Sequence, residues 1–133
     1  MKIIPAAHAP KMQLRSFLDT NNMIDEARLL AAGYVVEMKG RLEGCFVLEA
    51  IDSDVYWLKQ MYMTKNAALS LPGLLEAVLA LAKQKQAQTV YVYSHQLFVD
   101  IILEALQFHP QEKGIVVDND ANKPGNWWAY NVS

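Results

Sequence analysis

The chain has 133 residues, of which 53% are hydrophobic and 20% charged, and its formal net charge is −2. This length suits one domain with a single core, and the composition is neither that of a disordered chain nor that of a membrane-embedded one. The basic residues are scattered and form no row that would neutralise nucleic-acid phosphates, so nucleic-acid binding is not expected.

The residues that most often bind metals or form disulfides are sparse. Cys45 is the only cysteine, which excludes an internal disulfide and a CxxC zinc site. His8, His95 and His109 lie far apart without the spacing of metal ligands, so no metal site is predicted. The longest apolar run is interrupted and reads as too short to span a bilayer, and the N-terminus does not resemble a signal peptide. A cytoplasmic protein without membrane contact is therefore expected.

The first half of the chain predicts two helices followed by antiparallel strands. Apolar spacing predicts helices over Pro10–Asp19 and Met23–Ala32, with Thr20–Asn22 between them and Gly33 ending the second in a left-handed conformation. A β-hairpin is predicted over Tyr34–Ile51. Its polar turn spans Lys39–Gly44, and a third strand follows over Val55–Thr64.

The stretch TKNAALSLPGLLEAVLALAKQK, Thr64–Lys85, predicts a short loop and a long helix with Ser70 as its N-cap. The remaining predicted elements are the strand Thr89–Ser94, the helix Gln96–Phe108 with a stripe of Leu97, Ile101, Leu103 or Ile102, and Leu106, and the strands Lys113–Asp118 and Asn126–Val132. A strand that follows a helix implies a parallel crossover. The order ααβββαβαββ, without repeats or linkers, therefore predicts one α/β (α+β) domain over residues 1–133, with a mixed antiparallel and parallel sheet flanked by helices.

This order resembles the GNAT (Gcn5-related N-acetyltransferase) fold from about Tyr34 to Phe108. VEMKGRLEGCFVL resembles the second and third strands of the family, and LKQMYMTKNAALSLPGLLEAVLALAKQKQAQTVYVYS resembles its fourth strand, cofactor loop, third helix and fifth strand. Leu74 and Leu75 stand at the paired leucines of the family, and Ala82 at its buried alanine. The resemblance implies acetyl-CoA, or another acyl-CoA, as co-substrate. It also implies transfer of the acyl group to an amine by direct attack, without a covalent enzyme intermediate.

The cofactor loop departs from the family pattern. Asn66, Leu69 and Leu71 occupy the slots of a glutamine or arginine and two small residues. Glycines there let backbone amides approach the pyrophosphate closely. The two leucines either crowd this position or pack away from it, and the sequence leaves both alternatives open. Gly73 and Ser70 remain as a source of backbone N–H groups and a hydroxyl donor.

The following helix departs as well. Leu103 stands where the family usually has a tyrosine that protonates the thiolate of coenzyme A, and a leucine cannot donate a proton. Gln96 replaces an asparagine that commonly touches the cofactor. Gln107 replaces a glycine that ends the helix, at a cost of about 1 kcal/mol in the left-handed conformation.

By the resemblance, a backbone N–H near the end of the fourth strand stabilises the oxyanion. Tyr62 and His95 are the candidate catalytic side chains, because both lie on the strands that border the cofactor in this fold. The predicted cofactor contacts are Met61, Met63, Asn66, Leu69, Ser70, Leu71, Gly73 and Gln96.

Three other features have two interpretations each. Cys45 is better explained as a buried apolar residue than as a nucleophile. Tyr91 and Tyr93 suit half-buried strand positions better than catalysis. Alternation puts Trp127 and Trp128 on opposite faces of a strand, so one is expected to face away from the core, as a dimer contact or a substrate wall.

The sequence thus predicts an acetyl-CoA-dependent N-acetyltransferase acting on an unidentified small-molecule or peptide amine. The alternative is a catalytically inactive GNAT-like domain that serves as a CoA-sensing or protein-interaction module. A homodimer is compatible with either.

Overall fold

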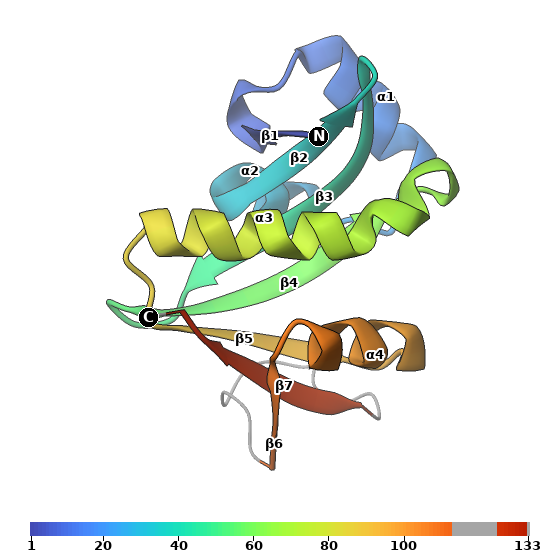
Figure 1. Ribbon diagram of the computed structural model, residues 1–133. Coiled ribbons are helices and arrows are strands. Elements are labelled where there is room, and N and C mark those ends of the chain that lie inside the picture. The colour runs from blue at the N-terminus through green and yellow to red at the C-terminus, as the bar shows by residue number, and fades with distance from the viewer. Residues whose placement is uncertain (113–124, 133) are drawn as a thin grey trace. The chain divides into compact units, whose positions relative to one another are not determined.

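The computed structural model describes residues 1–112 and 125–132 (Figure 1). Its elements are β1 (Lys2–Pro5), the 3-10 helix η1 (Ala6–His8), α1 (Lys11–Thr20), α2 (Glu26–Ala32), β2 (Gly33–Met38), β3 (Arg41–Ala50), β4 (Val55–Met63), the 3-10 helix η2 (Lys65–Ser70), α3 (Leu71–Gln84), β5 (Thr89–Ser94), α4 (Leu97–Ala105), β6 (His109–Gln111) and β7 (Asn126–Asn131). The strands form a 7-stranded sheet in the order β1-β2-β3-β4-β5-β7-β6. β4 and β5 pair in parallel, whereas β1–β2, β2–β3, β5–β7 and β6–β7 pair antiparallel. The predicted mixed α/β fold class is confirmed.

Contacts within the chain group into two compact units. The N-terminal unit comprises Met1–Glu49 and Lys59–Leu74, and the C-terminal unit comprises Ala50–Leu58 and Leu75–Ser133. The division passes through β4 and through α3. The organisation as one domain stays a prediction, and the two units are described separately.

The core of the N-terminal unit forms where α1, α2 and η1 cover β2 and β3. Its buried residues are Ala6, Ala9, Leu14, Phe17, Leu18, Leu29, Val35, Leu42, Cys45 and Val47. Leu14, Phe17 and Leu18 of α1 are spaced three and four residues apart, which puts them on one face of the helix. This periodicity is the reason that α1 was predictable.

Three predictions for this unit are corrected. β1 was missed, because the four-residue segment KIIP is too short to show an alternating pattern, yet it pairs antiparallel with β2. α2 begins at Glu26 rather than Met23, because the side chain of Asp25 caps it by accepting a hydrogen bond from the N–H of Arg28 at 3.1 Å. Gly33 is extended, with φ −111° and ψ 171°, and begins β2 instead of adopting the left-handed conformation.

The hairpin turn is shorter than predicted. Only Lys39 and Gly40 form it, with φ values of 53° and 78°, as a two-residue turn of primed type requires. Gly44 lies within β3, where an added Cβ would meet the carbonyl oxygen of Tyr62 at 2.7 Å. Glycine is therefore needed here for the close approach of β4, and not for the turn.

The C-terminal unit contains the alternating strand β5. Val90, Val92 and Ser94 are buried, whereas Tyr91 and Tyr93 are half-buried, as predicted. Trp128 of β7 is buried, and its Nε1–H donates a hydrogen bond to Oδ1 of Asp100 in α4 at 2.8 Å.

Trp127 lies on the opposite face of β7, as the alternation predicts. It is half-buried and does not face away from the unit, because its ring contacts the rings of Trp57, Tyr91 and Tyr93 at centroid distances of 5.9, 6.5 and 5.1 Å. Both tryptophans therefore pack within the C-terminal unit.

The predicted stripe on α4 is correct only in part. Ile102 and Leu103 are buried, but Leu97 and Ile101 are 75% and 59% exposed. This helix is apolar on most of its surface, so its sequence did not distinguish the inward face. The predicted strand Lys113–Asp118 lies outside the described residues. A short strand, β6, precedes it and was missed because a proline interrupts it.

η2 continues into α3, and together they form a helical segment over Lys65–Gln84. By length and composition this segment could cross a membrane, with 20 residues and a mean hydropathy of 1.2. The expectation that the stretch is too short is therefore wrong. Core helices of soluble proteins meet the same criterion, and the buried face of α3 carries the Leu74–Leu75 pair and Ala82.

Gln107 has φ 72°, so the left-handed residue predicted after α4 is confirmed. Gln107→Gly is expected to raise the free energy of unfolding by about 0.5–1 kcal/mol, because glycine adopts this conformation without strain. Urea denaturation measures the change. Gln84→Gly at the end of α3, where no positive φ is required, is the control and should lower the stability. Equal effects of the two variants would contradict the argument.

Cys45 lies buried in β3, and its Sγ–H donates to the carbonyl oxygen of Gln60 at 3.7 Å. Burial raises the pKa of its thiol from 9.0 to about 12. Between these two pH values the unfolded chain loses the thiol proton and the native protein keeps it, so this group makes stability fall as pH rises through the window.

Two outcomes are expected for this thiol. A thiol reagent at pH 8 should label Cys45 only at the rate of unfolding, because a buried neutral thiol is unreactive. The loss of urea resistance between pH 8 and pH 10 should be smaller in Cys45→Ala than in the unchanged protein. Rapid labelling of the native protein would show that the thiol is accessible.

Candidate functional site

β4 changes its backbone geometry halfway along its length. Val55–Leu58 pair in parallel with Thr89–Val92 of β5. Two residues later, Gln60 has φ 52°, a left-handed value that is unusual inside a strand. The Oε1 of Gln60 accepts a hydrogen bond from the backbone N–H of Asp25 at 3.3 Å, which fixes the irregular position from the α1–α2 connection. Met61–Met63, the segment expected to supply the oxyanion donor, follows directly.

The two leucines of the cofactor loop point in different directions. Leu69 is 94% exposed, whereas Leu71 is only 8% exposed and belongs to the core. The predicted loop is the 3-10 helix η2, and α3 begins at Leu71. Leu71 therefore packs inward, and Leu69 extends into solvent.

The start of the η2–α3 segment suits an anion. Neither η2 nor α3 has an acidic residue in its first turn, and Lys65 and Asn66 are exposed at the beginning of η2. Gly73 is also exposed, and the nearest atom to an added Cβ is the Cε of Met1 at 3.9 Å. A helix start without nearby carboxylates favours a bound phosphate through its dipole and its free N–H groups. Ser70, next to it, is half-buried.

The predicted catalytic side chains lie in different units. Tyr62 is half-buried in the N-terminal unit, with its ring 6.4 Å from that of Phe17. His95 is exposed after β5 in the C-terminal unit, next to the exposed Gln96 that precedes α4. Leu103, at the slot of the family's tyrosine, is 0% exposed. The roles of Tyr62 and His95 stay predictions.

A cleft in the N-terminal unit was not predicted. It has a volume of about 670 Å³, within the range of small-molecule sites, and one face of α1, the start of β3, the end of β4 and η2 surround it. Its lining residues are Met12, Gln13, Ser16, Phe17, Thr20, Asn21, Gly40, Arg41, Leu42, Glu43, Tyr62, Thr64 and Asn66. The only feature of the sequence that relates to this cleft is the row of polar residues on α1 beside its buried face. Such a row is typical of any helix exposed to solvent.

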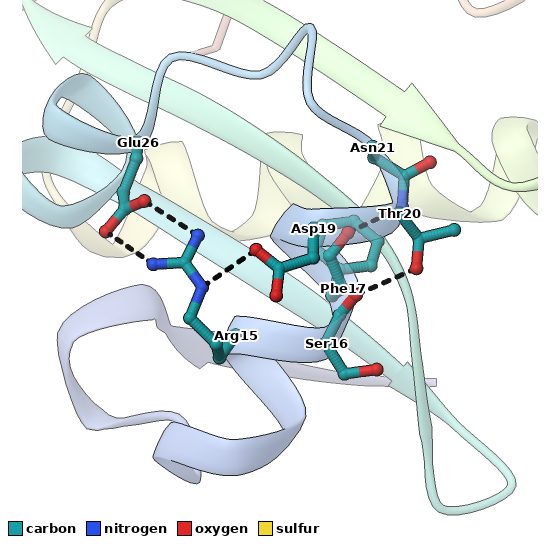
Figure 2. A network of polar contacts seen from close by, with 7 residues as sticks. All are labelled: Arg15, Ser16, Phe17, Asp19, Thr20, Asn21 and Glu26. Carbon is teal, nitrogen blue, oxygen red and sulfur yellow. Dashed lines mark hydrogen bonds and ion pairs between the residues drawn. The ribbon is translucent and has the colours of Figure 1, made fainter.

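An ion-pair network holds α1 against α2 (Figure 2). The Nη2 and Nη1 of Arg15 donate to the two carboxylate oxygens of Glu26 at 3.0 and 3.3 Å, and its Nε donates to Asp19 at 3.1 Å. The hydrogen bond to Glu26 is the largest of the effects that raise the pKa of Arg15. These groups are exposed, so the network orients the helix that forms one wall of the cleft more than it adds to stability.

Two cleft residues at the end of α1 use their donors within the helix. The Oγ1–H of Thr20 donates to the carbonyl oxygen of Ser16 at 2.9 Å, and the Nδ2 of Asn21 donates to that of Phe17 at 2.8 Å (Figure 2). Thr64, at the end of β4, has a buried hydroxyl without a hydrogen-bond partner among the described residues.

Elsewhere in the described part of the chain, residues 1–112 and 125–132, no group of three or more His, Cys, Asp or Glu residues could hold a metal ion. The described residues that line the cleft offer hydroxyls, amides, one phenol and two charged side chains.

No protein-family model matches the sequence, and a comparison with curated proteins finds no match. Solved structures do resemble the fold. An N-acetyltransferase from Staphylococcus aureus Mu50 is 14% identical, with a TM-score of 0.74 over 98% of this chain and 97% of that one. A GNAT-family acetyltransferase from the same organism is 17% identical, with a TM-score of 0.69 over 99% of both chains. A Mycobacterium tuberculosis protein, Rv2747, solved in complex with CoA and NLQ, is 10% identical, with a TM-score of 0.71 over 98% of this chain and 99% of that one.

At these identities the likeness concerns the fold. It extends over nearly the whole chain, including the first helices and the last strands, which the sequence resemblance did not cover. The chain has the fold of the GNAT-family acetyltransferases, which confirms the resemblance seen in its sequence.

Proposed function

We propose that this protein is an acetyl-CoA-dependent N-acetyltransferase that acts on a small-molecule or peptide amine. The observation that carries the proposal is the η2–α3 segment of a GNAT fold, where Leu69 extends into solvent and no carboxylate occupies the first turn. The directions of Leu69 and Leu71 support the alternative in which the two leucines leave room for a pyrophosphate.

Several groups would hold the co-substrate. The backbone N–H groups of Ser70 and Gly73 and the side chain of Asn66 would bind its phosphates, and Lys65 adds a nearby positive charge. When bound, acetyl-CoA supplies a thioester carbon that a neutral amine attacks. A C–N bond then forms, the C–S bond breaks, the amine nitrogen gives up a proton and the CoA thiolate takes one.

The chain's own contribution to this step is positioning and proton transfer. A backbone N–H of Met61–Met63 would donate to the developing oxyanion, a function that no side-chain substitution removes. Tyr62 carries a phenol, which can donate a proton to a leaving thiolate. Because the side chain of Leu103 cannot donate a proton, Tyr62 of the N-terminal unit is the candidate acid.

A second function has its own observation. Leu103 is completely buried and occupies the position of the family's tyrosine, so the chain lacks the usual acid. A domain that binds CoA as a sensor, without turnover, needs the η2–α3 segment but no acid.

Ala68→Glu is expected to weaken CoA binding about tenfold, because it introduces a negative charge on the exposed side of η2 near the phosphates. Isothermal titration with CoA measures the affinity. Ala31→Glu, on the exposed side of α2, is the matched control and should bind CoA as the unchanged protein does. If the unchanged protein does not bind CoA at millimolar concentration, both functions are wrong.

Tyr62→Phe is expected to lower kcat about 100-fold or more and to leave CoA affinity unchanged, because it removes a proton but little volume. Thiol release across a panel of amines, with the product identified by mass spectrometry, measures turnover. Tyr56→Phe, another half-buried tyrosine of β4, serves as the control. Tight CoA binding without turnover of any amine by the unchanged protein would favour the sensor.

A further inference from the structure

We infer that the cleft of the N-terminal unit binds the ammonium group of an organic cation with an apolar or aromatic body. The ligand would be the acceptor amine in its protonated form. This inference rests on the proposed function for the chemistry that follows binding, but the binding itself depends only on the residues of the cleft.

Two residues at the end of α1, Thr20 and Asn21, offer acceptors toward the cleft, whereas Gln13 and Ser16 on the same wall can both donate and accept. The hydroxyl proton of Thr20 is committed to the carbonyl oxygen of Ser16, so toward a ligand this hydroxyl can only accept (Figure 2). The amide nitrogen of Asn21 donates to Phe17, and its carbonyl oxygen Oδ1 remains as an acceptor. An ammonium group has three donors and no acceptor, so it complements these two acceptors.

Glu43 supplies the negative charge. The register of β2 against β3 shifts beside Glu43, because Val36 pairs with Gly44 and Glu37 pairs with Leu42, which leaves Glu43 as the extra residue of a bulge. The residue is half-buried, and within residues 1–112 and 125–132 no side chain forms an ion pair or hydrogen bond with its carboxylate. A half-buried carboxylate attracts a cation more strongly than an exposed one, because water screens it less.

Among the residues that the structure describes, Arg41 is the only cationic one that lines the cleft. It is exposed at the beginning of β3, where water and salt screen its charge. The half-buried Glu43 therefore dominates the electrostatics inside the cleft.

Aromatic and apolar side chains define the rest of the ligand. The rings of Phe17 and Tyr62 lie 6.4 Å apart at an angle of 50°, and Met12 and Leu42 also line the cleft. Aromatic faces attract cations and accept flat apolar groups. A short ammonium chain that ends in an apolar or aromatic group matches both parts of the cleft.

Thr64 gives an independent indication that the cleft is made for a polar ligand. Its Oγ1 is buried without a partner in the described residues, although the residue lines the cleft. A buried hydroxyl without a hydrogen bond is unfavourable. A rotation of about 120° about the Cα–Cβ bond moves the hydroxyl to another staggered position, so a ligand in the cleft could recruit it.

Three small molecules with the same aromatic body but different charge test the inference. Phenethylamine, phenethyl alcohol and hydrocinnamate are titrated into the full chain without CoA, and binding is followed by NMR. The amine is expected to bind at least tenfold more tightly than the neutral alcohol, and the acid most weakly. Equal affinities of amine and alcohol, or tighter binding of the acid, would overturn the inference.

Two variants identify the groups responsible. Glu43→Gln should weaken the amine about tenfold and leave the alcohol unchanged, whereas Glu37→Gln, a half-buried glutamate of β2 that does not line the cleft, should leave both unchanged. Thr64→Val should weaken the amine about fivefold and yet raise the Tm by about 2–5 °C, because it removes an unpaired buried hydroxyl. A fall in Tm, or an unchanged amine affinity in both cleft variants, contradicts the assignment.

The outcomes separate this inference from the proposed function. Binding of the amine without acetylation would support the ammonium site and contradict the proposed acetyltransferase activity. Acetylation that is unchanged in Glu43→Gln and Thr64→Val would support the proposed activity and show that the acceptor amine binds outside this cleft.

Discussion

The irregular backbone at Gln60 is the constraint on which the N-terminal unit depends. A non-glycine residue with positive φ costs on the order of 1 kcal/mol, so its surroundings must hold it there. Two contacts do so, one from the N–H of Asp25 to its side chain and one from the thiol of Cys45 to its carbonyl. The α1–α2 connection, β3 and β4 thus meet at a single strained residue. The strain marks the point where the described pairing of β4 with β5 has ended and the Met61–Met63 segment begins.

A second irregularity lies further along the same pair of strands. The bulge at Glu43 shifts the register of β3, and its carbonyl oxygen accepts a hydrogen bond from the N–H of Thr64 at 2.9 Å. Bulges commonly redirect a side chain beside a functional site. Here the bulged residue and Thr64 both line the cleft, so the irregular position in β3 and the unpaired hydroxyl at the end of β4 belong to one local arrangement.

The sequence predicted features that repeat and missed those that depend on distant segments. Helical spacing in α1 and alternation in β5 gave the correct elements, because each burial pattern is contained in the segment itself. The directions of Leu69 and Leu71 could not be derived, because a 3-10 helix turns them apart where a loop was expected. The cleft has no signal of its own, because helix α1, the hairpin and the end of β4 only meet after folding.

The candidate functions also differ in what they require from the sequence. Phosphate binding at the η2–α3 segment and oxyanion stabilisation by β4 both use backbone N–H groups, which persist when side chains change. Proton transfer requires a particular side chain, and the position at which the sequence resemblance predicts it holds a completely buried leucine, Leu103. Binding and turnover can therefore be lost separately in such a fold. Tyr62 would separate the two, because its phenol lines the cleft and the residue lies within the Met61–Met63 segment. If Tyr62 reaches the leaving thiolate, this chain keeps the chemistry of its fold with an acid on β4 in place of one on α4.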